Sequence, residues 1–205
     1  NAPKAVKIAI RLDEGDELIR VKLTEGTSDI FVASHMGKMI RFNEKDVRDM
    51  GRVSRGVRAM TLDDGDYVIG MDTECENGKM LVVSEYGFGK KTELSEYKCQ
   101  SRGGKGTTTY KISNATGALA GMEIVTPDDD IMLITSEGII IRMDSEDIST
   151  YGRVTKGVRL MRFADGVSII SIAKVVKDSE DDSETAENTG TQEESDVQTT
   201  ENAEE

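Results

Sequence analysis

An internal repeat of about 50 residues is the feature that most constrains how this chain of 205 residues can fold. Segments 29–41, 79–91 and 130–142 align in an apolar run, a Ser or Thr, a glycine and a final basic residue, with spacings of 50 and 51 residues. Fifteen residues after each glycine a second pattern follows, Arg-x-x-(Arg or Lys)-Gly, here called the basic box, at 52–56, 102–106 and 153–157. Such copies are typical of repeat proteins, in which each unit buries its apolar surface against its neighbours.

Each unit reads as a set of short β-strands. The apolar runs are rich in Val, Ile and Leu and are separated by Gly or Asp-Gly turns, and no segment shows a convincing helical stripe. Because four strands in about 50 residues is typical of a propeller blade, we predict an all-β β-propeller or β-pinwheel of four-stranded blades, forming a partial arc of three full blades plus one incomplete blade. The predicted parts are the end of an incomplete blade at 1–28, blades at 29–78 and 79–129, a last blade at 130–176 and a disordered acidic tail at 177–205.

The net charge of −13 is concentrated in that tail. Residues 177–205 contain 12 acidic residues and one lysine, a net charge of −11, so residues 1–176 carry 25 basic and 27 acidic groups, a net charge of −2. The tail has no aromatic residue and is dominated by polar side chains, so it cannot bury enough apolar surface to offset its ordering entropy. The body of the chain is therefore nearly neutral, which leaves a polyanionic partner open.

Several other classes of site and protein are disfavoured. Cys75 and Cys99 lack the CxxC or His neighbours of a zinc or redox site and are expected to be reduced thiols in a cytoplasmic protein, and His35 is expected to be an ordinary loop residue. No apolar run is long enough to span a membrane, and no phosphate loop of the GxxxxGK[ST] type is present. The chain begins inside a repeat and without a start methionine, which indicates a piece of a longer protein.

Basic residues recur at three fixed positions of the repeat. One position follows the glycine turn, and the other two lie in the basic box; together they are Arg41, Lys91 and Arg142, then Arg52, Arg102 and Arg153, then Arg55, Lys105 and Lys156. If the units stack as blades, these side chains form a basic stripe that can follow a phosphate backbone, with the neighbouring glycines allowing close approach of backbone N–H groups. The alternative is ordinary solvated surface that gene duplication has repeated.

The repeat, and above all Gln100-Ser-Arg-Gly-Gly-Lys-Gly106, resembles the C-terminal domains of DNA gyrase A subunits. These domains form a family of six-bladed β-pinwheels that wrap DNA around their perimeter. The resemblance covers residues 4–176 and includes Tyr151-Gly-Arg-Val-Thr-Lys-Gly157. It implies non-sequence-specific binding and wrapping of duplex DNA in support of negative supercoiling. The DNA-binding residues predicted on this basis are Arg41, Arg52, Arg55, Lys90, Lys91, Gln100, Arg102, Gly103, Gly104, Lys105, Gly106, Arg142, Arg153 and Lys156.

The same resemblance implies a bacterial, cytoplasmic, nucleoid-associated complex of two A and two B subunits. ATP and magnesium would be used by the rest of that complex, so no cofactor and no catalytic residue are expected here; the family's cleaving tyrosine follows an arginine, and no tyrosine of this chain does.

The box at 100–106 departs from the family signature, because Ser101 stands where a basic residue is expected and the box lies in the middle repeat rather than the first blade. Two alternatives remain: the A-type subunit of topoisomerase IV, and a non-catalytic propeller for protein–protein interaction. The latter would be expected to expose aromatic anchors, and the chain has no Trp and 4 Phe.

Overall fold

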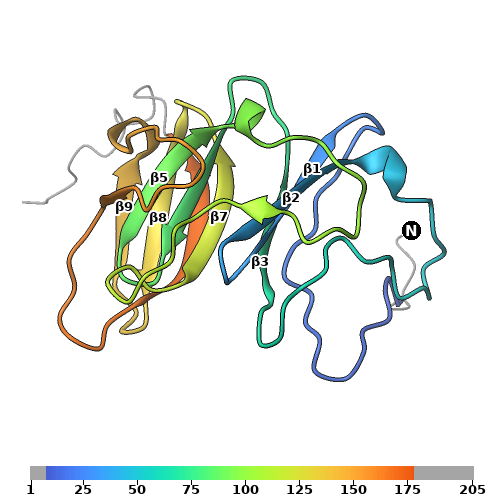
Figure 1. Ribbon diagram of the computed structural model, residues 1–205, viewed down its shortest axis with the longest axis horizontal. Helices are drawn as coiled ribbons and strands as arrows, with labels where there is room; N and C mark the ends of the chain where they lie inside the picture. The colour runs from blue at the N-terminus through green and yellow to red at the C-terminus, as the bar shows by residue number, and fades with distance from the viewer. Residues whose placement is uncertain (1–7, 178–205) are drawn as a thin grey trace, which may run out of the picture.

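The computed structural model describes residues 8–177, and in this part the chain is all-β, as the repeat predicts. Figure 1 shows the sheets side by side, like successive blades of a propeller. The predicted disordered tail lies outside the described residues, apart from Lys177. Between residues 8 and 177 no helix is long and apolar enough to cross a membrane.

The strands form three antiparallel sheets (Figure 1). The first has the order β3-β1-β2-β6, with β3 at Val68–Thr73, β1 at Asp29–Ser34, β2 at Lys38–Asn43 and β6 at Thr107–Thr108. The second has the order β10-β5-β4-β7, with β10 at Val158–Arg159, β5 at Phe88–Glu93, β4 at Lys79–Ser84 and β7 at Leu119–Val125. The third has the order β11-β8-β9, with β11 at Ile169–Val176, β8 at Asp129–Thr135 and β9 at Ile140–Asp144. Short 3₁₀ turns follow β2, β5 and β9, namely η1 (Glu44–Asp46), η2 (Leu94–Glu96) and η3 (Ser145–Asp147).

The central strand β4 shows why the apolar runs are continuous rather than alternating. Met80 and Val82 belong to the core between the first and second sheets, whereas Leu81 and Val83 belong to the core between the second and third. Successive side chains of a strand point to opposite faces, so a blade between two neighbours needs apolar residues at every position. The glycine after β4, Gly87, has a φ of 77° and makes the tight turn into β5.

The outer strand of each complete sheet comes from the following repeat. In the first sheet Thr107 pairs with Met39 of β2, and in the second Val158 pairs with Gly89 of β5. The last glycine of the second and third boxes makes this approach possible: a Cβ on Gly106 would lie 2.5 Å from the Met39 carbonyl oxygen, and one on Gly157 would lie 2.2 Å from the Gly89 carbonyl oxygen. The repeats therefore interlock by strand exchange, and the division of the chain at 29, 79 and 130 stays a prediction.

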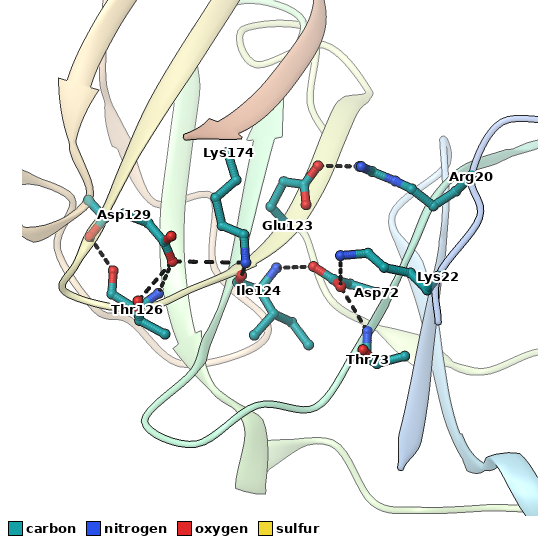
Figure 2. Close-up of polar contacts among 10 residues, drawn as sticks. Arg20, Lys22, Asp72, Thr73, Glu123, Ile124, Thr126, Asp129 and Lys174 are labelled. Carbon is teal, nitrogen blue, oxygen red and sulfur yellow. Dashed lines mark hydrogen bonds and ion pairs between the residues drawn. The ribbon is translucent and has the colours of Figure 1, made fainter. Parts of the chain in front are cut away.

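A buried polar cluster ties the inner strands together (Figure 2). Ile124 of β7 donates its N–H to Asp72 of β3 at 2.8 Å, and its carbonyl oxygen accepts from Nζ of Lys174 of β11 at 2.9 Å. Residues 8–28 contain no strand, but they reach this cluster through an ion pair of Lys22 with Asp72 at 2.8 Å and another between Arg20 and Glu123. Side chains from both neighbouring sheets thus satisfy backbone groups on the free edge of β7.

Candidate nucleic-acid interface

The basic box at 102–106 lies against the first repeat, which fixes its conformation. The Arg102 guanidinium donates to the carbonyl oxygen of Arg58 at 2.6 Å and to that of Asp46 at 3.3 Å. Gly103 N–H donates to the carbonyl oxygen of Ala59 at 2.7 Å, and the Gly104 carbonyl oxygen accepts from Thr61 N–H at 2.8 Å. The backbone N–H of Gly103 is therefore already used within the protein.

The next box, at 153–157, is held in the same way by the second repeat. Arg153 N–H donates to the Glu96 carboxylate at 2.7 Å, and its guanidinium donates to the carbonyl oxygen of Thr108. The first arginine of each of these two boxes thus binds a neighbouring repeat, whereas Arg52 of the first box is exposed. Gln100, two residues before the middle box, is half-buried and donates its backbone N–H to the Arg41 carbonyl oxygen at 2.9 Å.

The second basic residue reaches solvent in all three boxes. The side chains of Arg55 and Lys105 are 68% and 69% exposed, and Lys156 is also exposed. Arg55 pairs with Asp13 at 3.1 Å and Lys105 with Asp63 at 2.7 Å, and both of these aspartates are exposed. The hydrogen bond that the Lys105 ammonium donates to Asp63 raises the pKa of Lys105, which therefore stays charged at neutral pH. Exposed pairs of this kind are weak, so the cations can exchange them for phosphate contacts.

The basic residues after the glycine turns hold the repeats together. Arg41 has a side chain that is only 17% exposed; it pairs with Asp29 at 2.7 Å and Glu74 at 3.1 Å and donates to the carbonyl oxygens of Leu94 and Tyr97 in the next repeat. The equivalent Lys91 donates to the carbonyl oxygen of Ser145 at 2.7 Å, and burial lowers its pKa. Leu94 and Ser145 begin η2 and η3, so the contact is the same at both interfaces. The third equivalent, Arg142, is more exposed and pairs with Asp130 at 2.6 Å.

Lys90 does not fit the prediction that it contacts DNA, because its side chain is fully buried. Its Nζ donates to the carbonyl oxygens of Gly152 at 2.7 Å and Arg153 at 2.5 Å. Burial lowers the pKa of Lys90 to about 8. Lys90 therefore stabilises the backbone at the start of the third box and does not reach the solvent-facing surface.

Further exposed basic residues lie near the boxes and were missed by the alignment of the apolar runs. They recur in pairs at the same offsets from the boxes: Arg48 and Lys98, Arg58 and Arg159, and Lys111 and Arg162. The signal was present in the spacing, because Arg58 and Arg159 each follow the second basic residue of a box by three positions. Among residues 8–177 no cluster of His, Cys, Asp and Glu could hold a metal ion.

The chain matches a family model described as DNA gyrase C-terminal domain, beta-propeller, over residues 7–25, 28–73, 78–126 and 129–175. The A subunit of DNA gyrase from Staphylococcus aureus (strain NCTC 8325 / PS 47) is 43% identical over 178 residues, which are 86% of this chain and 20% of that protein. The chain therefore spans about a fifth of the length of the curated relatives it matches.

Two solved structures share the architecture closely. The C-terminal domain of DNA topoisomerase IV superposes with a TM-score of 0.78 at 26% identity, covering 82% of this chain and 53% of that one. The DNA gyrase A C-terminal domain superposes with a TM-score of 0.75 at 29% identity, covering 82% of this chain and 58% of that one. The E. coli ParC C-terminal domain, with a TM-score of 0.61 at 18% identity, shares the fold.

Proposed function

The chain belongs to the DNA gyrase C-terminal domain family, and on that premise we propose that it binds duplex DNA without sequence preference and bends it around the outer edge of the blades, within the A-type half of a gyrase. The observation that carries the proposal is the second basic residue of the box. Arg55, Lys105 and Lys156 occupy the same place in three successive repeats, and all three are exposed.

The contacts expected are with phosphates rather than bases. Each of these three residues lies two positions before the outer strand or its equivalent, so the cations follow the spacing of the blades. Regularly spaced cations neutralise a duplex backbone and carry no sequence information. Bending a site of 20 to 30 base pairs costs about 1 to 6 kcal/mol, which several contacts per blade can offset.

We also propose the setting that the family implies. The chain would act in a bacterial topoisomerase complex with a B-type subunit, in the cytoplasm and on nucleoid DNA, in support of negative supercoiling. ATP and magnesium would be handled by the other parts of that complex. Strand cleavage would likewise belong to the rest of the A-type protein.

A topoisomerase IV protein of the A type is the second candidate, and the TM-score of 0.78 with the topoisomerase IV C-terminal domain favours it. The 43% identity to the gyrase relative and the intact Arg102-Gly-Gly-Lys-Gly106 favour gyrase. Wrapping distinguishes the two candidates. When a nicked circular plasmid is sealed with ligase in the presence of a wrapping protein, its linking number shifts; a protein that binds without wrapping leaves the linking number unchanged.

The DNA-contacting residues can be tested by measuring duplex affinity against salt concentration. Removing one phosphate contact should reduce the slope of log K against log salt by about 0.9. We expect the double variant Lys105→Ala/Lys156→Ala to reduce this slope by about 2, and to weaken binding equally for unrelated sequences.

Two matched variants serve as controls. Lys105→Arg/Lys156→Arg keeps both charges and should bind as the parent does. Lys45→Ala/Lys79→Ala removes the same charge outside the boxes and should leave the slope nearly unchanged. If this second variant weakens binding as much as the box variant, the attraction is general and the boxes do not form the interface.

A further inference from the structure

The same backbone hydrogen bond attaches each basic box to the repeat before it, at a place here called a junction. It runs from Arg11 N–H to the Ser54 carbonyl oxygen at 3.2 Å, from Thr61 N–H to that of Gly104 at 2.8 Å, and from Lys111 N–H to that of Thr155 at 3.4 Å. The donors are 50 residues apart, and each acceptor directly precedes the second basic residue of its box. The bond therefore fixes which residues of one repeat face the exposed cation of the next.

An aspartate stands two residues after the donor at the first two junctions, and it pairs with the exposed cation of the box. Asp13 contacts Arg55 at 3.1 Å, and Asp63 contacts Lys105 at 2.7 Å. The hydrogen bond from Lys105 lowers the pKa of Asp63, so this carboxylate is ionised at neutral pH. A carboxylate and a phosphate both present anionic oxygens to an ammonium group, so Asp63 occupies the place that a DNA phosphate would take.

The third junction has no acid at this position. Ser113, exposed and uncharged, is the residue in register with Asp63. Within residues 8–177 the Lys156 ammonium forms no ion pair, and it lies 5.8 Å from the centre of the Phe88 ring. The donor of this junction, Lys111, is itself an exposed cation. The third junction therefore offers two cations and no competing carboxylate at the positions where the second offers one cation that is already paired.

This difference has a consequence for DNA binding. A paired lysine must give up its carboxylate before it contacts a phosphate, and the freed carboxylate then repels the DNA backbone. Lys156 meets neither cost. Because the Asp63–Lys105 pair is exposed to solvent, the expected difference for one box is about two- to fivefold in the dissociation constant.

We propose that the residue two positions after the junction donor sets how strongly each box holds DNA, with Asp63 competing against phosphate for Lys105 and Ser113 leaving Lys156 open. This inference rests on the proposed binding of duplex DNA and names the phosphate site that binds most tightly, the third junction. The duplex is then held unevenly, so it can leave the second box while the third still holds it.

Titration of a labelled duplex with the full chain at low salt tests the competitor. Asp63→Asn removes the charge and keeps the shape of the side chain, so it should tighten binding by about two- to fivefold. Asp64→Asn is the matched control, because Asp64 is the next residue, is also exposed and forms no ion pair within the described chain; it should change the affinity less. Equal gains from the two variants would indicate a general charge effect and overturn the proposal.

The converse change places a competitor at the third junction. Ser113→Asp should weaken binding by about two- to fivefold, because the new carboxylate stands in the register that Asp63 occupies beside Lys105. Asn114→Asp adds the same charge one residue further along the chain and should have a smaller effect. Equal losses from the two variants contradict the proposed register.

Alanine variants of the two lysines complete the test. In the parent chain Lys156→Ala should weaken binding more than Lys105→Ala does. In the Asp63→Asn background the loss caused by Lys105→Ala should increase, because its cation no longer has a competing partner. An unchanged loss in that background overturns the competitor role. A parent chain that does not bind duplex DNA overturns the proposed function itself, whereas a parent that binds as tightly as Asp63→Asn overturns this inference alone.

Discussion

Asp72 and Glu123 occupy equivalent positions on β3 and β7, yet we expect their removal to have opposite effects on stability. The Asp72 carboxylate accepts the N–H groups of Ile124 and Thr73 and the ammonium of Lys22, each at 2.8 Å (Figure 2). Burial opposes its ionisation, but these bonds outweigh it and lower the pKa of Asp72. Burial raises the pKa of Glu123, which is paired with Arg20 and accepts no backbone N–H from within residues 8–177.

The hydrogen bonds and the ion pair of the Asp72 carboxylate determine how much stability Asp72→Asn should lose. The amide keeps one acceptor oxygen and cannot serve all three donors, so a backbone N–H or the Lys22 ammonium loses its partner. An unpaired buried donor costs about 1 to 3 kcal/mol, and breaking a fully buried ion pair costs about 3 to 5 kcal/mol. The Lys22 side chain is 27% exposed and can turn towards water, which places the expected loss near the lower end, at about 3 kcal/mol. Glu123→Gln removes a buried charge without leaving a backbone N–H unpaired, so its effect should lie between zero and a gain of about 1 kcal/mol.

Urea unfolding of the parent and the two variants, at neutral pH and near pH 5, measures both effects. The folded pKa of Asp72 lies below its unfolded value of 3.8, so its contribution is fully present at both pH values, and the Asp72→Asn penalty should not change. The folded pKa of Glu123 lies above its unfolded value of 4.5, so the cost of its ionisation fades as the pH falls, and any advantage of Glu123→Gln should shrink towards pH 5. Equal penalties for the two variants at neutral pH would refute the reasoning.

Three further outcomes are expected. The pKa of Lys90 is about 8 in the folded protein, below its usual 10.5, so between these pH values the unfolded chain holds one more proton than the folded chain. The free energy of unfolding of the parent should therefore increase as the pH rises from about 8 to 10. In Lys90→Met the urea midpoint should increase less over the same pH range. Gly157→Ala should destabilise the fold by more than about 3 kcal/mol, because its Cβ would lie 2.2 Å from a carbonyl oxygen. Gly56→Ala should cost only the left-handed backbone penalty of about 1 to 2 kcal/mol, because a Cβ there would meet nothing within 4 Å. Thermal unfolding compares the stabilities of the two variants. Arg41→Met should lose about 2 to 4 kcal/mol of stability through its broken ion pairs, yet bind duplex DNA as the parent does in a titration below its unfolding temperature.

The repeat pattern was sufficient to predict the fold class, because strands buried on both faces need continuous apolar runs at each period. It could not reveal the strand exchange. The strands β6 and β10 have two residues each, too few to show any periodicity, and their partners lie about 70 residues earlier in the chain. Only the glycines at the ends of the boxes hinted at a close approach between backbones.

The candidate site was predicted only in part, since exposure depends on neighbours that the local sequence does not identify. Lys90 and Lys91 are adjacent in the sequence; the first is fully buried beneath the third box, and the second binds the carbonyl oxygen of Ser145. Arg41 is held by Asp29 and Glu74, which are 12 and 33 residues away. These partners become visible only when the strands are paired.

Recurrence of a basic residue at a fixed register has two physical causes in a repeat fold, and its partners distinguish them. Arg41, Lys91 and Arg102 donate to backbone carbonyl groups of a neighbouring repeat, a contact that every junction between repeats must form again. Arg55 and Lys105 form ion pairs with exposed aspartates, which the packing does not require. The outward charge is therefore carried by loops whose shape depends on the adjacent repeat, so DNA affinity should depend on an intact stack of blades.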